Sequence, residues 1–126
     1  MVNSGSSANL LAVEAMLRPS RGVPRWRHGD EILVPALCWP TTLWPLVQLG
    51  LRPVFVDSDP ETLALDWTQA ESKLSPRTRG AMLIHILGYA ADLDRARDFC
   101  DRHHLTLIED CCEAFGAHWR GQHVGT

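Results

Sequence analysis

Four short apolar segments, separated by stretches with helical periodicity, are the feature that most constrains how this chain folds. The segments span residues 31–34, 53–57, 81–86 and 105–108. A strand that is apolar along its whole length is buried on both faces, as in a parallel sheet that helices cover on both sides. The sequence therefore predicts an α/β fold with a mostly parallel sheet between two helical layers.

The stretches between these segments carry helix signals. A Gly/Ser-rich loop at residues 3–9 leads into a helix that we expect to present Leu10, Val13 and Leu17 on one face. The other predicted helices each have a terminal residue of the expected kind: they are residues 41–49 before Gly50, residues 67–74 after Asp66, and a helix that Asp92 opens.

Composition and charge exclude several functional classes. A chain of 126 residues fits about one domain, and 12 Lys and Arg against 15 Asp and Glu give a net charge of −3. That balance is unlike the basic surface of a nucleic-acid-binding protein. The apolar segments are far shorter than the ~20 residues of a membrane helix, and no leader pattern follows Met1. We therefore expect a cytoplasmic protein with no nucleic-acid or membrane partner.

The four cysteines do not form a recognisable framework. Cys38, Cys100, Cys111 and Cys112 lack regular spacing and contain no Cys-x-x-Cys pair. Adjacent cysteines are poor shared ligands of one ion, so a redox or metal-binding module built on Cys111 and Cys112 with His118 and His123 is disfavoured. We expect reduced thiols and no metal site.

The first candidate site is the loop at the head of the first helix. Backbone N–H groups and the hydroxyls of Ser6 and Ser7 could hold an anion such as phosphate at the positive end of the helix. The alternative is that these residues only cap the helix. The loop lacks the G-x-x-x-x-G-K pattern of nucleotide-binding loops, so both interpretations stay open.

A second candidate is Trp39, in the loop after the first strand. An aromatic face there could stack on a flat ring, and the alternative is ordinary core or interface packing.

The third candidate is Asp110, which follows an apolar strand and so points to the crevice where parallel sheets bind ligands. A carboxylate there could hold a protonated heteroaromatic nitrogen, and Glu113 could reach the same ligand. The alternative is that residues 109–110 cap a turn. His85 could line the crevice or be a hydrogen-bonded structural residue.

Taken together, these positions resemble the DegT/DnrJ/EryC1/StrS sugar aminotransferase family, whose members are fold-type I pyridoxal-phosphate enzymes. The resemblance runs through nearly the whole chain in the family's order. Its motifs are Asn3-Ser4-Gly5-Ser6-Ser7-Ala8-Asn9-Leu10-Leu11, Gly29-Asp30-Glu31, Trp39-Pro40-Thr41-Thr42, Pro53-Val54-Phe55-Val56-Asp57, His85-Ile86-Leu87-Gly88 and the stretch from Ile108 to Gly116.

The resemblance implies roles for individual residues. Ser6 and Ser7 match the phosphate-binding pair, Trp39 the residue stacked on the pyridoxal ring, and Asp110 the partner of the pyridine nitrogen. Glu113 stands where the family's aminotransferases usually carry Gln near the phenolic oxygen. This departure, the Gly/Ser loop and the cysteine pair resemble the CDP-4-keto-6-deoxyglucose 3-dehydratase branch, which uses pyridoxamine phosphate to remove a sugar C3 hydroxyl.

The resemblance also implies what lies outside this chain. The sequence begins almost directly with the Gly/Ser loop, with no strand before it, and ends at residues 125–126 just after a turn. We therefore expect a fragment of the cofactor-binding large domain, without the N-terminal segment and the C-terminal small domain. The catalytic base, Lys in aminotransferases and His in dehydratases, would lie beyond Thr126, and Lys73 matches no catalytic position. Any iron–sulfur ligands would also lie downstream.

Three functions are left to distinguish. The resemblance implies a homodimeric enzyme of deoxysugar and lipopolysaccharide O-antigen biosynthesis that acts on a nucleotide-linked keto-deoxysugar. Dehydration is the first expectation, with a possible reductase partner, and amino transfer is the alternative. The remote alternative is a noncatalytic phosphate-binding fragment, and we expect the isolated 126 residues to be inactive.

Overall fold

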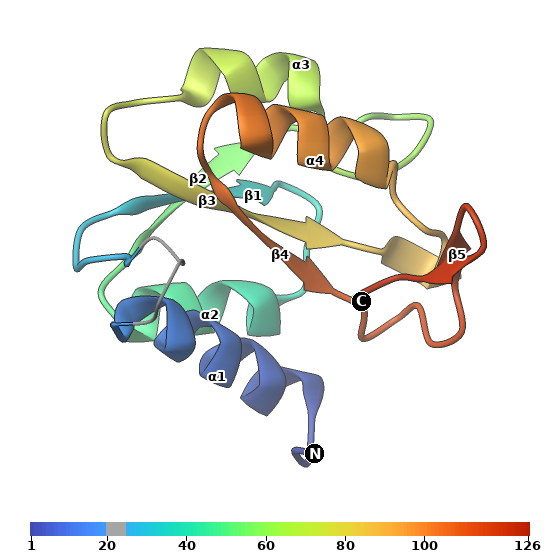
Figure 1. Ribbon diagram of the computed structural model, residues 1–126, viewed down its shortest axis with the longest axis horizontal. Coiled ribbons are helices and arrows are strands. Elements are labelled where there is room, and N and C mark those ends of the chain that lie inside the picture. The colour runs from blue at the N-terminus through green and yellow to red at the C-terminus, as the bar shows by residue number, and fades with distance from the viewer. Residues whose placement is uncertain (20–24) are drawn as a thin grey trace.

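A four-stranded parallel sheet forms the centre of the computed structural model, which describes residues 1–19 and 25–126 (Figure 1). The strands are β1 (Glu31–Pro35), β2 (Arg52–Val56), β3 (Thr78–Ile84) and β4 (Thr106–Asp110), in the order β2-β1-β3-β4. All three neighbouring pairs are parallel. The predicted parallel sheet is confirmed, and each strand lies within a few residues of its expected position.

Helices cover both faces of the sheet, as predicted. Figure 1 shows α1 (Gly5–Leu17) and α2 (Pro40–Gln48) on one face, with α3 (Trp67–Ala70) and α4 (Leu93–Arg102) on the other. None of the helices in the described ranges combines the length and the apolar character needed to cross a membrane.

The predicted caps are present, but two boundaries differ from expectation. Asp66 accepts the N–H groups of Thr68 and Gln69, and Asp92 accepts that of Arg95. The helix expected over residues 67–74 ends early and continues as a 3₁₀ turn, Glu71–Lys73. The third strand stops at Ile84, because the chain turns into the 3₁₀ segment Ile86–Gly88, which includes a left-handed residue.

Alternating side chains of the strands pack into two separate hydrophobic cores, one on each face of the sheet. Ile32 and Val34 of β1 pack with Val13 and the fully buried Trp26 on the α1 and α2 side. Leu33 points the other way, into the core beneath α3 and α4. This alternation is the period of two that a strand buried on both faces requires.

The buried face of α1 differs from the one predicted. Asn9 and Val13 are its buried residues, whereas Leu10 is 37% exposed. Asn9 and Val13 are four residues apart and share one helix face. The helix therefore turns Asn9, and not Leu10, toward the interior of the protein. The reason lies in the partner of Asn9, described below.

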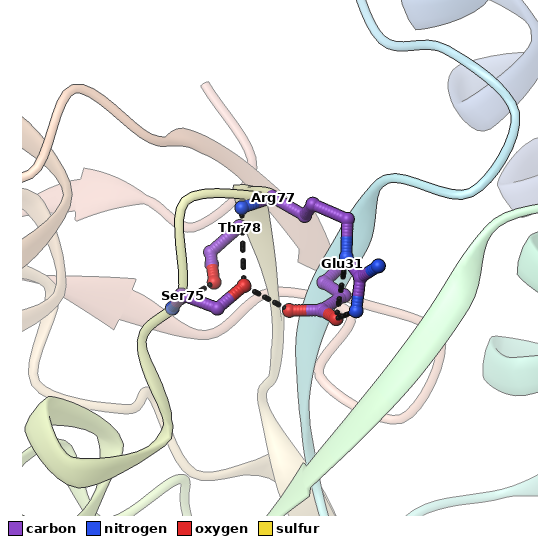
Figure 2. A network of polar contacts seen from close by, with 4 residues as sticks. All are labelled: Glu31, Ser75, Arg77 and Thr78. Carbon is purple, nitrogen blue, oxygen red and sulfur yellow. Dashed lines mark hydrogen bonds and ion pairs between the residues drawn. The ribbon is translucent and has the colours of Figure 1, made fainter.

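A polar cluster closes the edge of the sheet where β1 and β3 begin (Figure 2). Arg77 donates from Nε and Nη2 to Oε1 of the buried Glu31, at 3.2 and 2.9 Å, and the Ser75 hydroxyl donates to Oε2. Ser75 in turn donates its N–H to Thr78 Oγ1 at 2.9 Å. The cluster fixes this edge of the sheet, opposite to the edge where the strands end.

A small hairpin follows the last strand of the sheet. Its strands are β5 (His118–Trp119) and β6 (Gln122–His123), paired antiparallel. The sequence predicts the turn at residues 120–121 but not the short strands beside it.

Candidate functional site

Three of the predicted site residues line one cavity at the carboxyl edge of the sheet. Trp39, Asp110 and Glu113 contribute to a cavity of about 260 Å³, together with Thr42 of α2 and Cys112. Asp110 is the last residue of β4, and Trp39 precedes α2, in the loop after β1. Parallel strands bind ligands at this edge, so the position of the cavity is that of a ligand site.

Asp110 is held by three hydrogen bonds. Its Oδ2 accepts from Asn9 Nδ2 and from Thr42 Oγ1, both at 2.8 Å. Its Oδ1 accepts the backbone N–H of Cys112 at 3.1 Å. The turn-capping interpretation of Asp110 is therefore correct for one oxygen, while the other oxygen joins α1 and α2 to the end of β4.

The charge of Asp110 has no cationic partner among the described residues. Its side chain is buried, with 7% of the residue exposed, and no Lys, Arg or His of these ranges forms an ion pair with it. Buried charges in proteins are normally paired. A buried carboxylate on the wall of a cavity can therefore receive a cationic ligand.

Trp39 presents a large aromatic surface beside this carboxylate. Its side chain is 68% exposed and provides no side-chain cap to α2. Trp39 does not pack in a core of the described residues, since a core tryptophan such as Trp26 has no exposed surface, and packing at an interface stays the alternative prediction. An exposed indole at a cavity can stack on a planar ligand.

Glu113 contacts the turn that follows β3. Its Oε2 accepts the backbone N–H of Leu87 at 2.9 Å, in the turn that leaves β3. Leu87 has a φ of +52°, a left-handed conformation that this hydrogen bond helps to maintain. The contact holds the Glu113 carboxylate at the cavity while the rest of the side chain stays exposed.

Ser6 and Ser7 line a neighbouring cavity to which Asp110 does not contribute. This second cavity has a volume of about 570 Å³, and Thr41 borders both cavities. The Ser7 hydroxyl donates to Asn3 Oδ1 at 2.7 Å, and the Ser7 backbone N–H donates to Oγ of the cap residue Ser4 at 3.2 Å. Capping is thus performed by Ser4, and the exposed Ser6 forms no side-chain hydrogen bond within the described ranges.

His85 is a structural residue. It is fully buried, its Nδ1 accepts the Ala91 N–H at 3.0 Å, and its Nε2 lies 3.0 Å from Glu109 Oε2. An acceptor role for Nδ1 places the hydrogen of the neutral ring on Nε2, which therefore donates to Glu109.

The tautomer of His85 also bears on metal binding. His85, Glu109 and Cys111 bring one possible ligand atom each to within 4.8 Å of one another. The Ala91 contact places a hydrogen on Nε2. A metal could bind Nε2 only if this hydrogen were lost. Burial, followed by the charges of Glu109 and Asp110, raises the pKa of Cys111 to about 11, so its thiol stays protonated at neutral pH. The hydrogen bonds of the His85 ring to Ala91 and Glu109 therefore disfavour Nε2 as a metal ligand.

The cysteine pair packs against two glycines. A Cβ on Gly5 would lie 2.8 Å from Cys112 Sγ, and one on Gly125 would lie 2.8 Å from Cys111 Sγ. All four cysteines of the chain are free, as expected. Cys112 thus brings the turn after β4 into contact with the start of α1, which places the helix terminus next to the Asp110 cavity.

Sequence reasoning missed Asn9 and Thr42 as parts of the site. Both are buried, with 6% and 1% exposure, and both contact Asp110. The available signal was a polar residue four positions before Val13, on the face of α1 that had to be buried. A buried amide requires a hydrogen-bond partner, and this requirement rotates α1 away from the predicted Leu10 face.

Comparisons with known proteins give a consistent result. A model of the "DegT/DnrJ/EryC1/StrS aminotransferase family" matches residues 1–126. The chain is 44% identical to the lipopolysaccharide biosynthesis protein RfbH of Salmonella typhimurium over 123 residues, which are 98% of this chain and 28% of RfbH. It is 38% identical to an L-glutamine:2-deoxy-scyllo-inosose aminotransferase of Streptomyces kanamyceticus, covering 98% of this chain and 27% of that enzyme.

The fold is shared with a solved dehydratase. The E. coli GDP-4-keto-6-deoxy-D-mannose-3-dehydratase with bound hydrated PLP superposes with a TM-score of 0.90 at 38% identity, over 99% of this chain and 32% of that one. The chain therefore spans about a third or less of the length of these relatives. Because the family model covers every residue, the chain belongs to the DegT/DnrJ/EryC1/StrS aminotransferase family.

Proposed function

We propose that this chain is part of a pyridoxal- or pyridoxamine-phosphate-dependent enzyme that removes the C3 hydroxyl of a nucleotide-linked 4-keto-6-deoxyhexose. The observation that carries the proposal is the buried Asp110 carboxylate, which has no cationic partner in the described ranges and lines a cavity with Trp39. The similarity to the E. coli 3-dehydratase supports the choice of reaction, and the similarity to RfbH supports a role in lipopolysaccharide biosynthesis.

The residues of the cavity fit such a cofactor. Asp110 would hold the protonated ring nitrogen, Trp39 would cover the ring face, and Glu113 would lie near the phenolic oxygen. Ser6 and Ser7, with the N–H groups at the start of α1, would hold the phosphate in the neighbouring cavity. When bound, a protonated pyridine ring supplies an electron sink for breaking bonds next to the sugar carbonyl.

This chain's contribution to the reaction is binding and charge. Asp110 keeps the ring nitrogen protonated by pairing with it, and Trp39 excludes water from one ring face. The proton transfer that follows needs a base, and Lys73 is exposed in the 3₁₀ turn after α3, on the far face of the sheet from α1 and α2. We propose that the base is a His or Lys outside these residues.

The chain's place in the intact protein is also a proposal. We assign residues 1–126 to the cofactor-binding large domain, with an N-terminal segment, the catalytic Lys or His segment and a C-terminal small domain outside them. We further propose a cytoplasmic homodimer that serves O-antigen formation. Replacing the C3 hydroxyl by hydrogen is a two-electron reduction, and its electrons would come either from pyridoxamine phosphate, which is converted to the pyridoxal form, or from a reductase partner. Any iron–sulfur ligands would come from other residues.

Amino transfer to a nucleotide-linked keto sugar is the second candidate. The 38% identity to the Streptomyces aminotransferase supports it. Asp110 and Trp39 would hold the cofactor in the same way in either reaction. The residue that occupies the cofactor-lysine position of the intact protein distinguishes them. Lysine favours the aminotransferase, and histidine favours the dehydratase.

The test uses the intact protein with pyridoxamine phosphate, a nucleotide-linked 4-keto-6-deoxyhexose and, in parallel, glutamate. Mass spectrometry of the sugar is expected to show loss of the C3 oxygen without gain of nitrogen, and Asp110→Asn should abolish turnover. Gain of an amino group would establish the second candidate. Absence of cofactor binding, measured by absorbance, would overturn both.

A further inference from the structure

Two buried donors from different helices converge on a single oxygen of Asp110. Asn9 of α1 and Thr42 of α2 each donate to Oδ2 at 2.8 Å. Asn9 also reaches the Thr41 carbonyl oxygen at 3.4 Å. The residues lie 101 and 68 positions from Asp110 in sequence, so this convergence is a product of the tertiary fold.

Neither donor is explained by the needs of its own helix. Asparagine is a weaker helix former than the apolar residues around it, and burying an amide or a hydroxyl costs free energy unless it is hydrogen-bonded. Asn9 and Thr42 sit where an apolar side chain would pack without that cost, at 6% and 1% exposure. Their polar groups are therefore present for the carboxylate.

The hydrogen bonds leave the two carboxylate oxygens in different states. A carboxylate offers roughly four acceptor positions, two on each oxygen. Oδ2 accepts two donors, while Oδ1 accepts only the Cys112 N–H among the described residues. The remaining acceptor position of Asp110 therefore belongs to Oδ1, on a residue that lines the cavity with Trp39.

We propose that Asn9 and Thr42 are positioning residues that occupy Oδ2 of Asp110, fix the rotation of its carboxylate, and so reserve Oδ1 for a ring N–H of the ligand. The inference rests on the proposed function, because it takes the ligand to be a protonated pyridine. An aspartate carboxylate rotates broadly about its last torsion unless its oxygens are held. Removing either donor would let the carboxylate plane rotate away from this orientation and so weaken the directed bond to the ring.

The experiment compares two ligands that differ only at the ring nitrogen. Pyridoxal 5′-phosphate carries the N–H when protonated, and its 1-deaza analogue has a C–H there. In the intact protein, Thr42→Val and Asn9→Leu keep side-chain size and remove a donor. We expect each to weaken binding of pyridoxal phosphate about tenfold or more and to leave binding of the deaza analogue within about twofold of wild type.

The controls separate positioning from general stability. Thr42→Ser retains the hydroxyl and should restore the preference for pyridoxal phosphate. Thr106→Val removes a β4 hydroxyl that forms no side-chain hydrogen bond in the described ranges, and should change neither affinity. Equal loss of affinity for both ligands in Thr42→Val and Asn9→Leu would overturn the inference, because a purely structural role affects both alike.

The same measurements distinguish this inference from the proposed function. Asp110→Asn should remove the preference for pyridoxal phosphate over the deaza analogue. If it does, and neither Thr42→Val nor Asn9→Leu changes that preference, the positioning role is wrong and the cofactor assignment stands. If wild type itself shows no preference between the ligands, the role of Asp110 as pyridine partner fails, and the inference fails with it.

Discussion

Gly80 of β3 lies directly against the indole of Trp26. A Cβ on Gly80 would lie 2.4 Å from Trp26 Cζ2 and 2.7 Å from the backbone oxygen of Thr106 on the neighbouring strand. Real Cβ atoms do not approach other atoms this closely. The absence of a side chain at this position is what lets a tryptophan occupy the core between the sheet and α1.

The first prediction concerns this contact. Gly80→Ala should lower the free energy of unfolding of the intact protein by about 1–3 kcal/mol, because a close-packed core cannot accept the added methyl group without strain. Denaturant unfolding followed by tryptophan fluorescence measures the change. In a Trp26→Phe background, Gly80→Ala should lower the free energy of unfolding by less than it does in wild type, because the smaller ring leaves more room for the methyl group. An unfolding midpoint equal to wild type in Gly80→Ala would contradict the prediction.

The second prediction is a pH dependence set by Glu31. The Ser75 hydroxyl that donates to it, and then Arg77, hold the pKa of this carboxyl below its ordinary value of 4.5. A group whose folded pKa is lowered stabilises the fold above its unfolded pKa, and the stabilisation is lost as the pH falls through the folded value. Glu31→Gln should therefore destabilise the protein at neutral pH, with the difference from wild type shrinking below pH 4.5.

The control for Glu31 is Glu61, an exposed glutamate whose side chain forms no hydrogen bond or ion pair within the described ranges. Glu61→Gln should leave the pH profile of stability unchanged. Unfolding curves of both variants and wild type from neutral to acid pH provide the measurement. A difference between Glu31→Gln and wild type that stays constant through the acid range would show that the charge of Glu31 is not responsible.

The third prediction follows from the tautomer of His85. Because Nδ1 accepts the Ala91 N–H, Nε2 carries a hydrogen toward Glu109, and a metal at Nε2 would have to displace that hydrogen. Zn²⁺ added to the metal-free intact protein should not raise its melting temperature. A zinc ion that did bind would raise the free energy of unfolding by about 2.7 kcal/mol at a hundred times its dissociation constant, and the melting temperature would rise with it. Stoichiometric zinc binding by calorimetry that disappears in Glu109→Gln would refute the tautomer assignment.

The fourth prediction concerns Trp39. Trp39→Ala should weaken binding of pyridoxal phosphate by about three- to tenfold, the range expected for one lost aromatic stacking contact. Trp39→Phe keeps an aromatic face and should bind within about twofold of wild type. Absorbance titration gives both affinities. Equal binding by Trp39→Ala and wild type would show that the exposed indole does not contact the ring.

The sequence alone determined the order of the elements and the edge at which a ligand site would form. Apolar strands, the caps at Asp66 and Asp92, and the carboxylate at the end of the last strand are local signals that residues within a few positions of one another provide. The family was identified from such motifs as well. Trp39, Asp110 and Glu113 were brought to one cavity as expected, because the ends of parallel strands meet at one edge.

Only the tertiary structure decided which hydrogen-bond partners the buried polar groups near that cavity have. Asn9, Thr42 and the rotation of α1 depend on hydrogen bonds between residues 68 and 101 positions apart, which no local pattern encodes. The same is true of His85, whose ring direction is set by the Ala91 N–H and the Glu109 carboxylate on a neighbouring strand. Periodicity predicted the buried strands but not the buried face of α1, because the partner of a buried polar group is fixed only when distant segments pack together.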